Sequence, residues 1–340
     1  MARLLRMERA GAWYHITARG NERRVIFRDE RDRRHFLELM PPWWERFQCR
    51  VHAYVLMDNH YHLLLETLEG NLSRAMQWLN VSYTMWFNRR HQRVGHLLQG
   101  RFKAVMVEPE TWALGLSRYI HLNPVRIGRL GLSKAEQRQH RMGAGSRPSA
   151  ELVAQRLEAL RQFPWSSYRS YAGYVKAPDW LHTQRVLSYG GGAAAERKRR
   201  YRGYVESAIR EGLAEQPWQA LVGRLVLGSR DFVDGLIGKS ESPQWARAVR
   251  TRPTWAQVVA VVERMKGETW QEFGHRHNDW GRELALLLGR EKAGLRLAEL
   301  AAASGTATLV AVSMARKRFG ARVAADTSLR GLVAKARQQL

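Results

Sequence analysis

Two histidines separated by one residue, His60 and His62, lie inside an otherwise apolar stretch of the chain. The flanking residues are β-branched, aromatic or aliphatic, so the pattern predicts a strand, a turn at Asp58-Asn59 and a second strand. Residues i and i+2 of a strand point to the same face, which would place the two imidazoles side by side. Imidazole is a common metal ligand, so the pair is a candidate half of a metal site. Packed histidines without a chemical role are the alternative.

A second segment, residues 117–126, could complete this site. If it is helical, Tyr119 and Asn123 are i and i+4 and share a face. The amide oxygen of Asn123 could then be a third metal ligand, with the phenol of Tyr119 one turn away. A phenol has a pKa of about 10 and is a poor nucleophile unless it is activated. A metal ion could hold a phosphate beside it, neutralise the charge and polarise the phosphorus. Attack would give a phosphotyrosine link and conserve the bond energy, as strand transfer requires.

The charge of the chain points to the kind of substrate. Its 340 residues include 56 Lys and Arg against 31 Asp and Glu, a formal net charge of +25. Such an excess favours a polyanionic partner, and nucleic acid is the commonest one. A merely basic, solvated surface is the alternative. The length allows two or three domains, and 45% hydrophobic residues is ordinary for a protein with a core.

Cysteine content and the chain ends indicate a compartment. The single cysteine, Cys49, excludes an internal disulfide framework and a cysteine-based zinc site. A reducing cytoplasm is therefore expected, with association to the nucleoid for a DNA-binding protein. Residues 1–12 lack the apolar core of a signal peptide, so none is expected. No run of about 18 apolar residues is present, so no membrane partner is expected.

The elements that must position these residues follow from periodicity. Strands are expected at 12–18, 50–56, 60–66 and 104–108, and helices at 31–47, 72–90 and 111–123. Pro41-Pro42 should kink or split the first helix. The basic helix end at 89–92 is expected to be solvated. The first six elements follow the ferredoxin-like split βαβ plan, an antiparallel sheet with helices on one face. The fold class is therefore α+β, followed by a mainly α-helical C-terminal region.

The predicted domains are 1–130, a linker and packing segment at 131–190, and a helical region at 191–340. Near the C-terminus, one helix should stop at Gly305, and Thr306 could cap the next helix, which carries Arg316, Lys317 and Arg318. This pattern is typical of a helix-turn-helix DNA-binding domain with a basic second helix. A plain helical bundle with a basic face is the alternative.

Three motifs together resemble one family. They are His60-Tyr61-His62, Gln99-Gly100-Arg101-Phe102-Lys103, and Arg118-Tyr119-Ile120-His121-Leu122-Asn123-Pro124-Val125-Arg126. In this combination the chain resembles the HUH single-tyrosine transposases, which are IS200-like, and within them the REP-associated tyrosine transposases. The resemblance covers about residues 8–130. Residues 163–187, with Pro178-Asp179-Trp180, also resemble the longer members of this group.

The resemblance implies that 1–130 is a ferredoxin-like catalytic domain with a site for Mg²⁺ or Mn²⁺. His60, His62 and Asn123 would occupy the metal-ligand places, and Tyr119 the place of the nucleophile. The residue between the histidines is usually a bulky hydrophobe in this family. Here it is Tyr61, which strand alternation directs into the core. His121 at i+2 from Tyr119 is expected to be structural, and Glu66 to be a salt-bridged edge residue.

The family's substrate is single-stranded DNA carrying a REP-like hairpin flanked by a short guide sequence. Binding it requires phosphate contacts and base-stacking rings. The candidates for phosphate are Arg19, Arg23, Arg24, Arg101, Lys103 and Arg126, and those for stacking are Trp13, Phe102 and Trp112. Related mobile-element enzymes act as dimers, whereas the domesticated group resembles monomers. A monomer is therefore expected, with a dimer as the alternative.

The predicted function is a metal-dependent single-stranded DNA endonuclease and strand transferase that works through a covalent 5′-phosphotyrosine intermediate. The alternative is a hairpin-DNA-binding regulator of the same fold with little or no cleavage activity. A two-histidine phosphoesterase acting on RNA ends would need two His-x-Ser/Thr motifs on separate strands, and the sequence holds no such pair.

Overall fold

The computed structural model describes residues 6–127, 130, 132, 136–137, 148–211, 217–223, 225–238, 245–246, 249, 253–295, 297–306 and 308–340. The chain forms two compact units, Met1–Arg250 and Thr251–Leu340. This division differs from the predicted three parts, because the segments on both sides of residues 131 and 191 share one core with the strands. Each unit is described by itself below.

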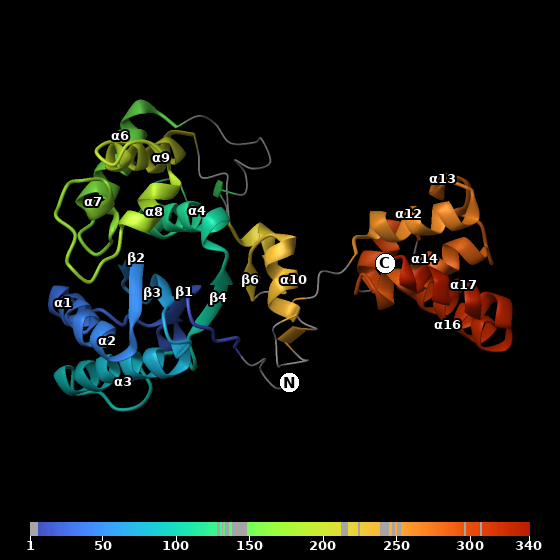
Figure 1. Cartoon of the computed structure of the whole chain (residues 1–340), viewed down its shortest axis with the longest axis horizontal. Helices are drawn as coiled ribbons and strands as arrows, with labels where there is room; N and C mark the ends of the chain where they lie inside the picture. Colours follow the sequence, from blue (N-terminus) through green and yellow to red (C-terminus); the bar gives the residue numbers. More distant parts are fainter. Residues whose placement is uncertain are drawn as a thin grey trace. The chain divides into compact units, whose positions relative to one another are not determined.

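The first unit is built on a sheet whose first four strands are β1 (Ala12–Arg19), β2 (Cys49–Met57), β3 (His60–Thr67) and β4 (Lys103–Val107). Their order is β2-β3-β1-β4, and all neighbours among them are antiparallel. This is the strand order of the ferredoxin-like plan, which confirms the predicted fold class (Figure 1). Two short strands extend the sheet beyond β4, with β6 (Val226–Leu227) parallel to β4 and β5 (Leu221–Val222) antiparallel to β6.

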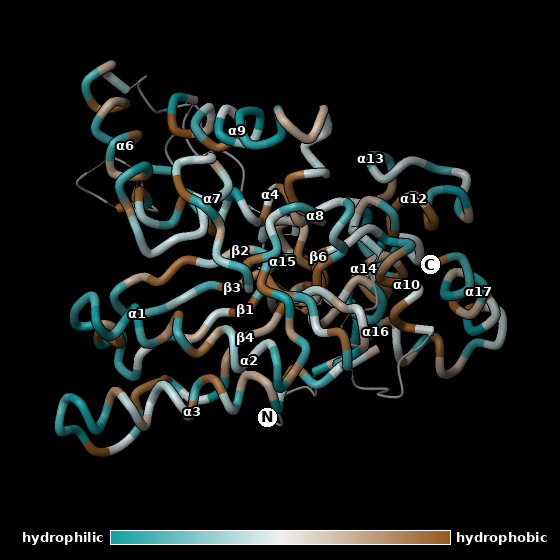
Figure 2. Tube along the Cα trace, turned by 60° about the vertical axis from the view of Figure 1, so that its left-hand side comes forward, coloured by the Kyte–Doolittle hydropathy of each residue, from teal (hydrophilic) through white to brown (hydrophobic). Residues whose placement is uncertain are grey.

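One face of the sheet is covered by α1 (Glu30–Glu38), α2 (Met40–Phe47) and α3 (Leu72–Arg90). The predicted helix 31–47 is split at Leu39, and Pro41 and Pro42 stand in the first turn of α2, where proline costs no hydrogen bond. The strands are largely apolar (Figure 2). Alternate residues of β1 and β3 pack in the core beneath these helices. The resulting core includes Tyr14, Ile16, Phe36, Trp43, Tyr61, Leu63, Leu65, Met76 and Tyr83.

The opposite face carries a second layer of helices that the six-element plan does not include. It comprises α4 (Pro109–His121), α6 (Ala150–Gln162), α7 (Tyr168–Tyr171), α8 (Gln184–Tyr189) and α9 (Arg197–Glu211). Trp13, Val55 and Leu64 from the strands pack with Leu116 and Ile120 of α4. A sheet that is apolar on both faces must be covered on both. The helices that follow residue 130 in the chain help to cover this second face.

The segment predicted to begin a separate helical region also belongs to this core. Tyr201, Val205 and Ile209 of α9 are buried in it. Glu206 of the same helix accepts two hydrogen bonds from Arg161, at 2.8 and 2.6 Å. Farther along, α10 (Arg230–Gly238) follows β6, and its buried side chains pack in the other core of the sheet. A domain boundary at 190 would divide these contacts.

The second unit is entirely helical in its described part. It contains α12 (Trp255–Lys266), α13 (Trp270–Phe273), α14 (Trp280–Glu291), α15 (Leu297–Ser304), α16 (Leu309–Ala325) and α17 (Thr327–Gln338). Its core is formed by side chains from α12, α13, α14, α16 and α17. The predicted helical C-terminal region is confirmed. Across the described part of both units, no helix has the length and apolar character needed to cross a membrane.

Candidate active site

The topology of the sheet brings the candidate residues to one end. In the antiparallel register, Arg19 of β1 lies opposite His60 of β3. Thr17 lies opposite His62 on one side and Lys103 of β4 on the other. Directly opposed residues of antiparallel strands project from the same face. All five side chains therefore emerge on the face that α4 covers.

The two histidines are held by partners at their Nδ1 atoms. The ring centroids of His60 and His62 are 5.1 Å apart and nearly perpendicular. His62 Nδ1 lies 3.0 Å from Thr17 Oγ1 and 2.9 Å from His15 Nε2. His60 Nδ1 lies 2.7 Å from the carbonyl oxygen Oδ1 of Asn59, to which it donates. A ring that carries its proton on Nδ1 has a lone pair on Nε2, as a metal ligand requires.

Burial keeps the inner rings uncharged. His62 is only 6% exposed. Burial, with the neighbouring rings of His15 and His60, lowers the pKa of His62 well below its ordinary value. Burial also lowers the pKa of His15 to about 3. Neutral imidazole is the form that binds a metal, so this donor set fits a divalent cation.

Tyr119 stands in the last turn of α4, over these rings. Its ring centroid lies 5.9 Å from that of His62 and 6.3 Å from that of His15, both edge-on. The guanidinium of Arg126 lies 4.4 Å from the centre of the Tyr119 ring. The structure therefore brings together His62 of the histidine motif with Tyr119 and Arg126 of the motif at 118–126.

Trp218 completes the wall beside Tyr119. It belongs to η4 (Pro217–Ala220), and its ring lies 5.0 Å from that of Tyr119 and 4.8 Å from that of His15. Sequence reasoning did not select it, because it is one of 13 tryptophans and belongs to no motif. His15 and Thr17 were also missed, although their i, i+2 spacing on a strand repeats that of His60 and His62.

Asn123 lies just beyond α4, in η2 (Asn123–Val125). Its Nδ2 donates to the carbonyl oxygens of Tyr119 at 2.9 Å and Ile120 at 3.3 Å. These bonds tie the amide to the end of α4 and leave Oδ1 as its acceptor. Within the described residues, no group of three or more His, Cys, Asp or Glu side chains is placed to hold a metal ion. The predicted ligand set contains two such side chains and therefore depends on the Asn123 amide.

The residues predicted to be structural are confirmed as such. Tyr61 is buried on the opposite face, donates to Asn80 Oδ1 at 2.6 Å, and has a pKa raised by burial. His121 is buried between Tyr201 Oη and Ser167 Oγ, at 2.7 Å each, and burial lowers its pKa to about 3. Glu66 is salt-bridged as predicted, but it lies on the central strand β3 rather than at an edge.

The predicted phosphate-binding residues lie on segments anchored to this end of the sheet. The segment from Gly20 to Phe27 docks on the β2–β3 turn, where Asn59 Nδ2 donates to Arg23 O at 3.0 Å. Gln99 N donates to Arg19 O at 2.8 Å, which holds the strand carrying Lys103 close by. The exposed members of the set are Arg19, Arg23, Arg24, Arg101 and Lys103, and Arg126 is half-buried.

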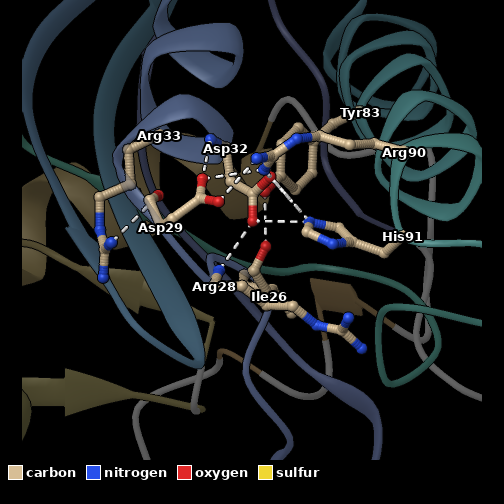
Figure 3. A network of polar contacts seen from close by, with 8 residues as sticks. All are labelled: Ile26, Arg28, Asp29, Asp32, Arg33, Tyr83, Arg90 and His91. Carbon is tan, nitrogen blue, oxygen red and sulfur yellow. Dashed lines mark hydrogen bonds and ion pairs between the residues drawn. The ribbon is translucent and has the colours of Figure 1, made fainter.

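An ion-pair network supports that docked segment (Figure 3). Asp29 caps α1 and accepts from Arg90 of α3 at 2.8 and 2.6 Å. His91 lies 2.9 and 3.0 Å from the two carboxylate oxygens of the buried Asp32. The prediction of a solvated helix end at 89–92 is therefore wrong for Arg90 and His91. Further bonds join Tyr83 to Ile26 O and Arg33 to Asp58.

The predicted stacking rings do not form an exposed platform. Trp13 is 1% exposed and is stacked on His52, with ring centroids 3.7 Å apart. Phe102 is buried in the core on the other face, under the guanidinium of Arg6. Trp112 is half-buried against the core beneath α4. The stacking prediction is therefore wrong for Trp13 and Phe102, whose faces are occupied by the protein itself.

Part of the chain is similar to known proteins. No curated protein matches the chain. A solved structure described as a "REP associates tyrosine transposase bound to a REP hairpin" is 16% identical, with 54% of this chain and 92% of that chain covered and a TM-score of 0.35. A similarity at this level carries no residue correspondence. The family model described as "Transposase IS200 like" matches residues 9–123. Residues 9–123, which carry both histidines, Tyr119 and Asn123, are therefore similar to the IS200-like transposase family.

Proposed function

We propose that this chain is a REP-associated tyrosine transposase, a metal-dependent endonuclease and strand transferase for single-stranded DNA with a REP-like hairpin. Tyr119 is its nucleophile. One observation carries the proposal. The ring of Tyr119, at the end of α4, lies 5.9 Å from that of His62, whose Nδ1 is held by Thr17 and His15. A tyrosine, two oriented histidines and a basic strand end are the parts that tyrosine-mediated phosphodiester cleavage needs.

His60, His62 and Asn123 would hold Mg²⁺ or Mn²⁺. When bound, the ion supplies charge neutralisation and polarisation at the scissile phosphate. The protein supplies the orientation of its ligands. Asn59 and Thr17 fix the rings of the two histidines, and the hydrogen bonds of Asn123 to α4 fix its amide. Such outer partners set the tautomer and the direction of each ligand atom.

Tyr119 attacks the phosphorus through its phenolic oxygen. The new Tyr119 O–P bond replaces the P–O bond to the 3′ oxygen, which leaves as a 3′ hydroxyl, and the phenol loses its proton. The product is a 5′-phosphotyrosine, and attack by a 3′ hydroxyl restores a phosphodiester without an external energy source. Arg126, stacked 4.4 Å from the ring centre, favours the negative charge that develops on the phenol.

The DNA backbone is held by the basic residues at the same end of the sheet. Arg19, Arg101 and Lys103 are exposed, and within the described residues none of them forms an ion pair. Their charges can therefore neutralise phosphates directly. Binding of this kind releases counterions, so affinity for the hairpin strand should fall steeply as salt rises. A flat response to salt would contradict this part of the proposal.

The test uses a single-stranded hairpin oligonucleotide with a 3′ or 5′ label and either Mg²⁺ or Mn²⁺. A covalent protein–DNA adduct that survives denaturing electrophoresis is expected. It should disappear in Tyr119→Phe and persist in Tyr61→Phe, a matched variant at the buried tyrosine of the histidine motif. An adduct that persists in Tyr119→Phe would show that another residue is the nucleophile.

The second candidate function is a hairpin-DNA-binding regulator with little or no cleavage. It is favoured by the composition of the metal site, which has two histidines and an amide but no carboxylate among its proposed ligands. Tight binding of the hairpin by the wild-type protein, without an adduct in either metal, would support the regulator. Adduct formation would exclude it.

A further inference from the structure

The second unit contains two consecutive helices, α15 and α16, whose facing ends carry local hydrogen bonds. α15 ends at Ser304, and Gly305 follows with φ of +66°, a left-handed conformation that favours glycine. Thr306 N donates to Ala301 O at 2.9 Å, and its hydroxyl lies 2.8 Å from Ser304 Oγ. Thr308, and not the predicted Thr306, caps α16 by accepting from Ala311 N at 3.2 Å. The described residues on both sides of the connection are therefore held by local hydrogen bonds.

α16 is anchored by one stripe of its surface. Val312, Ala315 and Phe319 are buried, and they pack in the two cores of the unit with residues of α14 and α15. These buried positions recur every three or four residues, as expected for a helix that lies on the rest of the unit. Val323, near the end of α16, also packs against one of these cores, whereas Val310, Ser313 and Met314 are exposed.

The opposite stripe of α16 is unusual for the surface of a small helical unit. It contains Val310, Ser313, Met314 and Lys317. The last three follow Val310 by three, four and seven positions, so all four side chains share one face of the helix. Val310 is 71% and Met314 48% exposed. Among the described residues of this unit they are the only large apolar side chains so exposed. Two such side chains on one stripe mark a contact surface rather than scattered exposure.

Basic residues lie next to this stripe, in the middle of α16. α16 contains Arg316, Lys317, Arg318 and Arg322 and no acidic residue. Arg322 is paired with Glu283 at 2.8 Å. Lys317 and Arg318 are exposed, and no ion pair to either occurs in the part of the chain that the structure describes. The first half of the helix is thus uncharged, and its middle carries the positive charges of Lys317 and Arg318.

We propose that α16 is a recognition helix for double-stranded DNA. In a helix-turn-helix, the N-terminal residues of the second helix contact base edges in the major groove, and flanking basic residues contact phosphates. Val310, Ser313 and Met314 occupy the base-reading positions, where apolar side chains can contact thymine methyl groups. Lys317 and Arg318 occupy the phosphate-binding positions. This activity goes beyond the proposed single-strand chemistry and gives the chain a second DNA-binding element.

The same stripe does not fit single-stranded DNA. Proteins that bind single strands stack bases on exposed aromatic rings. The only aromatic residue of α16 is Phe319, which is buried. An α-helix about 10–12 Å across fits the major groove of duplex DNA, which is about 12 Å wide. The chemistry and shape of the stripe therefore both favour a duplex.

The first test measures duplex binding by the full chain as a function of salt, on a sequence selected from a randomised duplex pool. Lys317→Ala/Arg318→Ala is expected to weaken binding about tenfold or more and to lower the salt slope by about two. The matched control is Arg264→Ala/Lys335→Ala, which removes the same charge from exposed positions of α12 and α17. Equal losses in the two double variants would overturn the proposal, because they would reduce the effect to net charge.

The second test addresses sequence reading. Val310→Ser/Met314→Ser should reduce the preference for the selected duplex over a random one by about tenfold and leave random-duplex binding intact. An unchanged preference would overturn the base-reading assignment. All of these variants should still form the Tyr119 adduct on the single-stranded hairpin, and Tyr119→Phe should still bind the duplex. Failure of the duplex-binding proposal can therefore be distinguished from failure of the proposed transposase chemistry.

Discussion

One face of the central sheet carries two histidine clusters, one at each end of β3, and they differ in what their ring nitrogens contact. At the first end, His60 and His62 use Nδ1 for contacts with Asn59, Thr17 and His15. At the second end, both nitrogens of His52 are occupied. Its Nδ1 lies 2.9 Å from His182 O, and its Nε2 lies 3.4 Å from Glu66 Oε2.

The surroundings of the second cluster explain its different role. Glu66 is nearly buried and also pairs with Arg185 at 3.2 Å and Arg50 at 3.6 Å. These residues line a pocket of about 400 Å³, but its central carboxylate is already neutralised by its own neighbours. A histidine on a strand of this sheet therefore does not define a metal site by itself. The carboxylates and outer partners around it decide between a ligand and a structural link.

The largest effect should come from removing a proposed ligand at the first end. His60→Ala is expected to reduce the rate of adduct formation by at least about a hundredfold, because loss of even an outer partner of a metal ligand costs about 10- to 100-fold. His60 is half-buried at the start of β3, so thermal stability should change little. Mn²⁺ titration and adduct kinetics measure the effect.

The matched control is His52→Ala at the second end. It should lower the unfolding temperature and leave the adduct rate of the folded protein unchanged. If His52→Ala abolished the adduct while His60→Ala did not, the roles of the two clusters would be reversed.

A smaller effect, on stability alone, is expected from Glu66→Gln. The neutral side chain leaves Arg185 and Arg50 without their shared carboxylate. Breaking such a pair costs about 3–5 kcal/mol when both partners are buried. The arginines are 46% and 40% exposed, so about 2–3 kcal/mol of unfolding free energy should be lost here. Urea denaturation measures this loss. A stability equal to that of wild type would show that the cluster contributes no net energy.

Asn59 offers a finer test of the first cluster. Asn59→Ala removes the acceptor of His60 Nδ1. It should weaken Mn²⁺ binding about 10-fold, the lower end of the range of effects seen when a hydrogen-bond partner of a metal ligand is lost. Asn59→Asp keeps an oxygen acceptor for His60 and loses only the Nδ2 donation to Arg23 O. Metal affinity should therefore recover in the aspartate variant. Equal losses in both variants would indicate that Asn59 acts only through the loop.

The comparison also shows what a sequence can and cannot reveal. His60, His62 and Tyr119 were predictable, because strand alternation and helical spacing assign their faces and a family motif joins them. The role of His52 was not predictable, because the register between β2 and β3 shifts between Val51 and Ala53. A bulge of this kind breaks the alternation from which a face is inferred.

Long-range partners were equally inaccessible. Trp218 reaches Tyr119 from a part of the chain almost 100 positions away, through a fold of the polypeptide that no local pattern encodes. The pairing of Arg90 and His91 with Asp29 and Asp32 likewise depends on α1 and α3 lying side by side on the sheet. Periodicity predicted those helices and their order, but the ion pairs between them follow only from the packed structure.

The smallest expected effect is the dependence of stability on pH at the second cluster. Burial alone would raise the pKa of Glu66, but His52, Arg185 and Arg50 outweigh it and lower the pKa. A carboxylate with a lowered folded pKa stabilises the protein above its unfolded pKa of about 4.3, and this contribution is lost as the pH falls. The stability difference between wild type and Glu66→Gln should therefore be constant near neutral pH and narrow below about pH 4.3. Urea denaturation at pH 7, 5, 4 and 3 measures it. A difference that stays constant to pH 3 would show that Glu66 stabilises the sheet through packing and not through its charge.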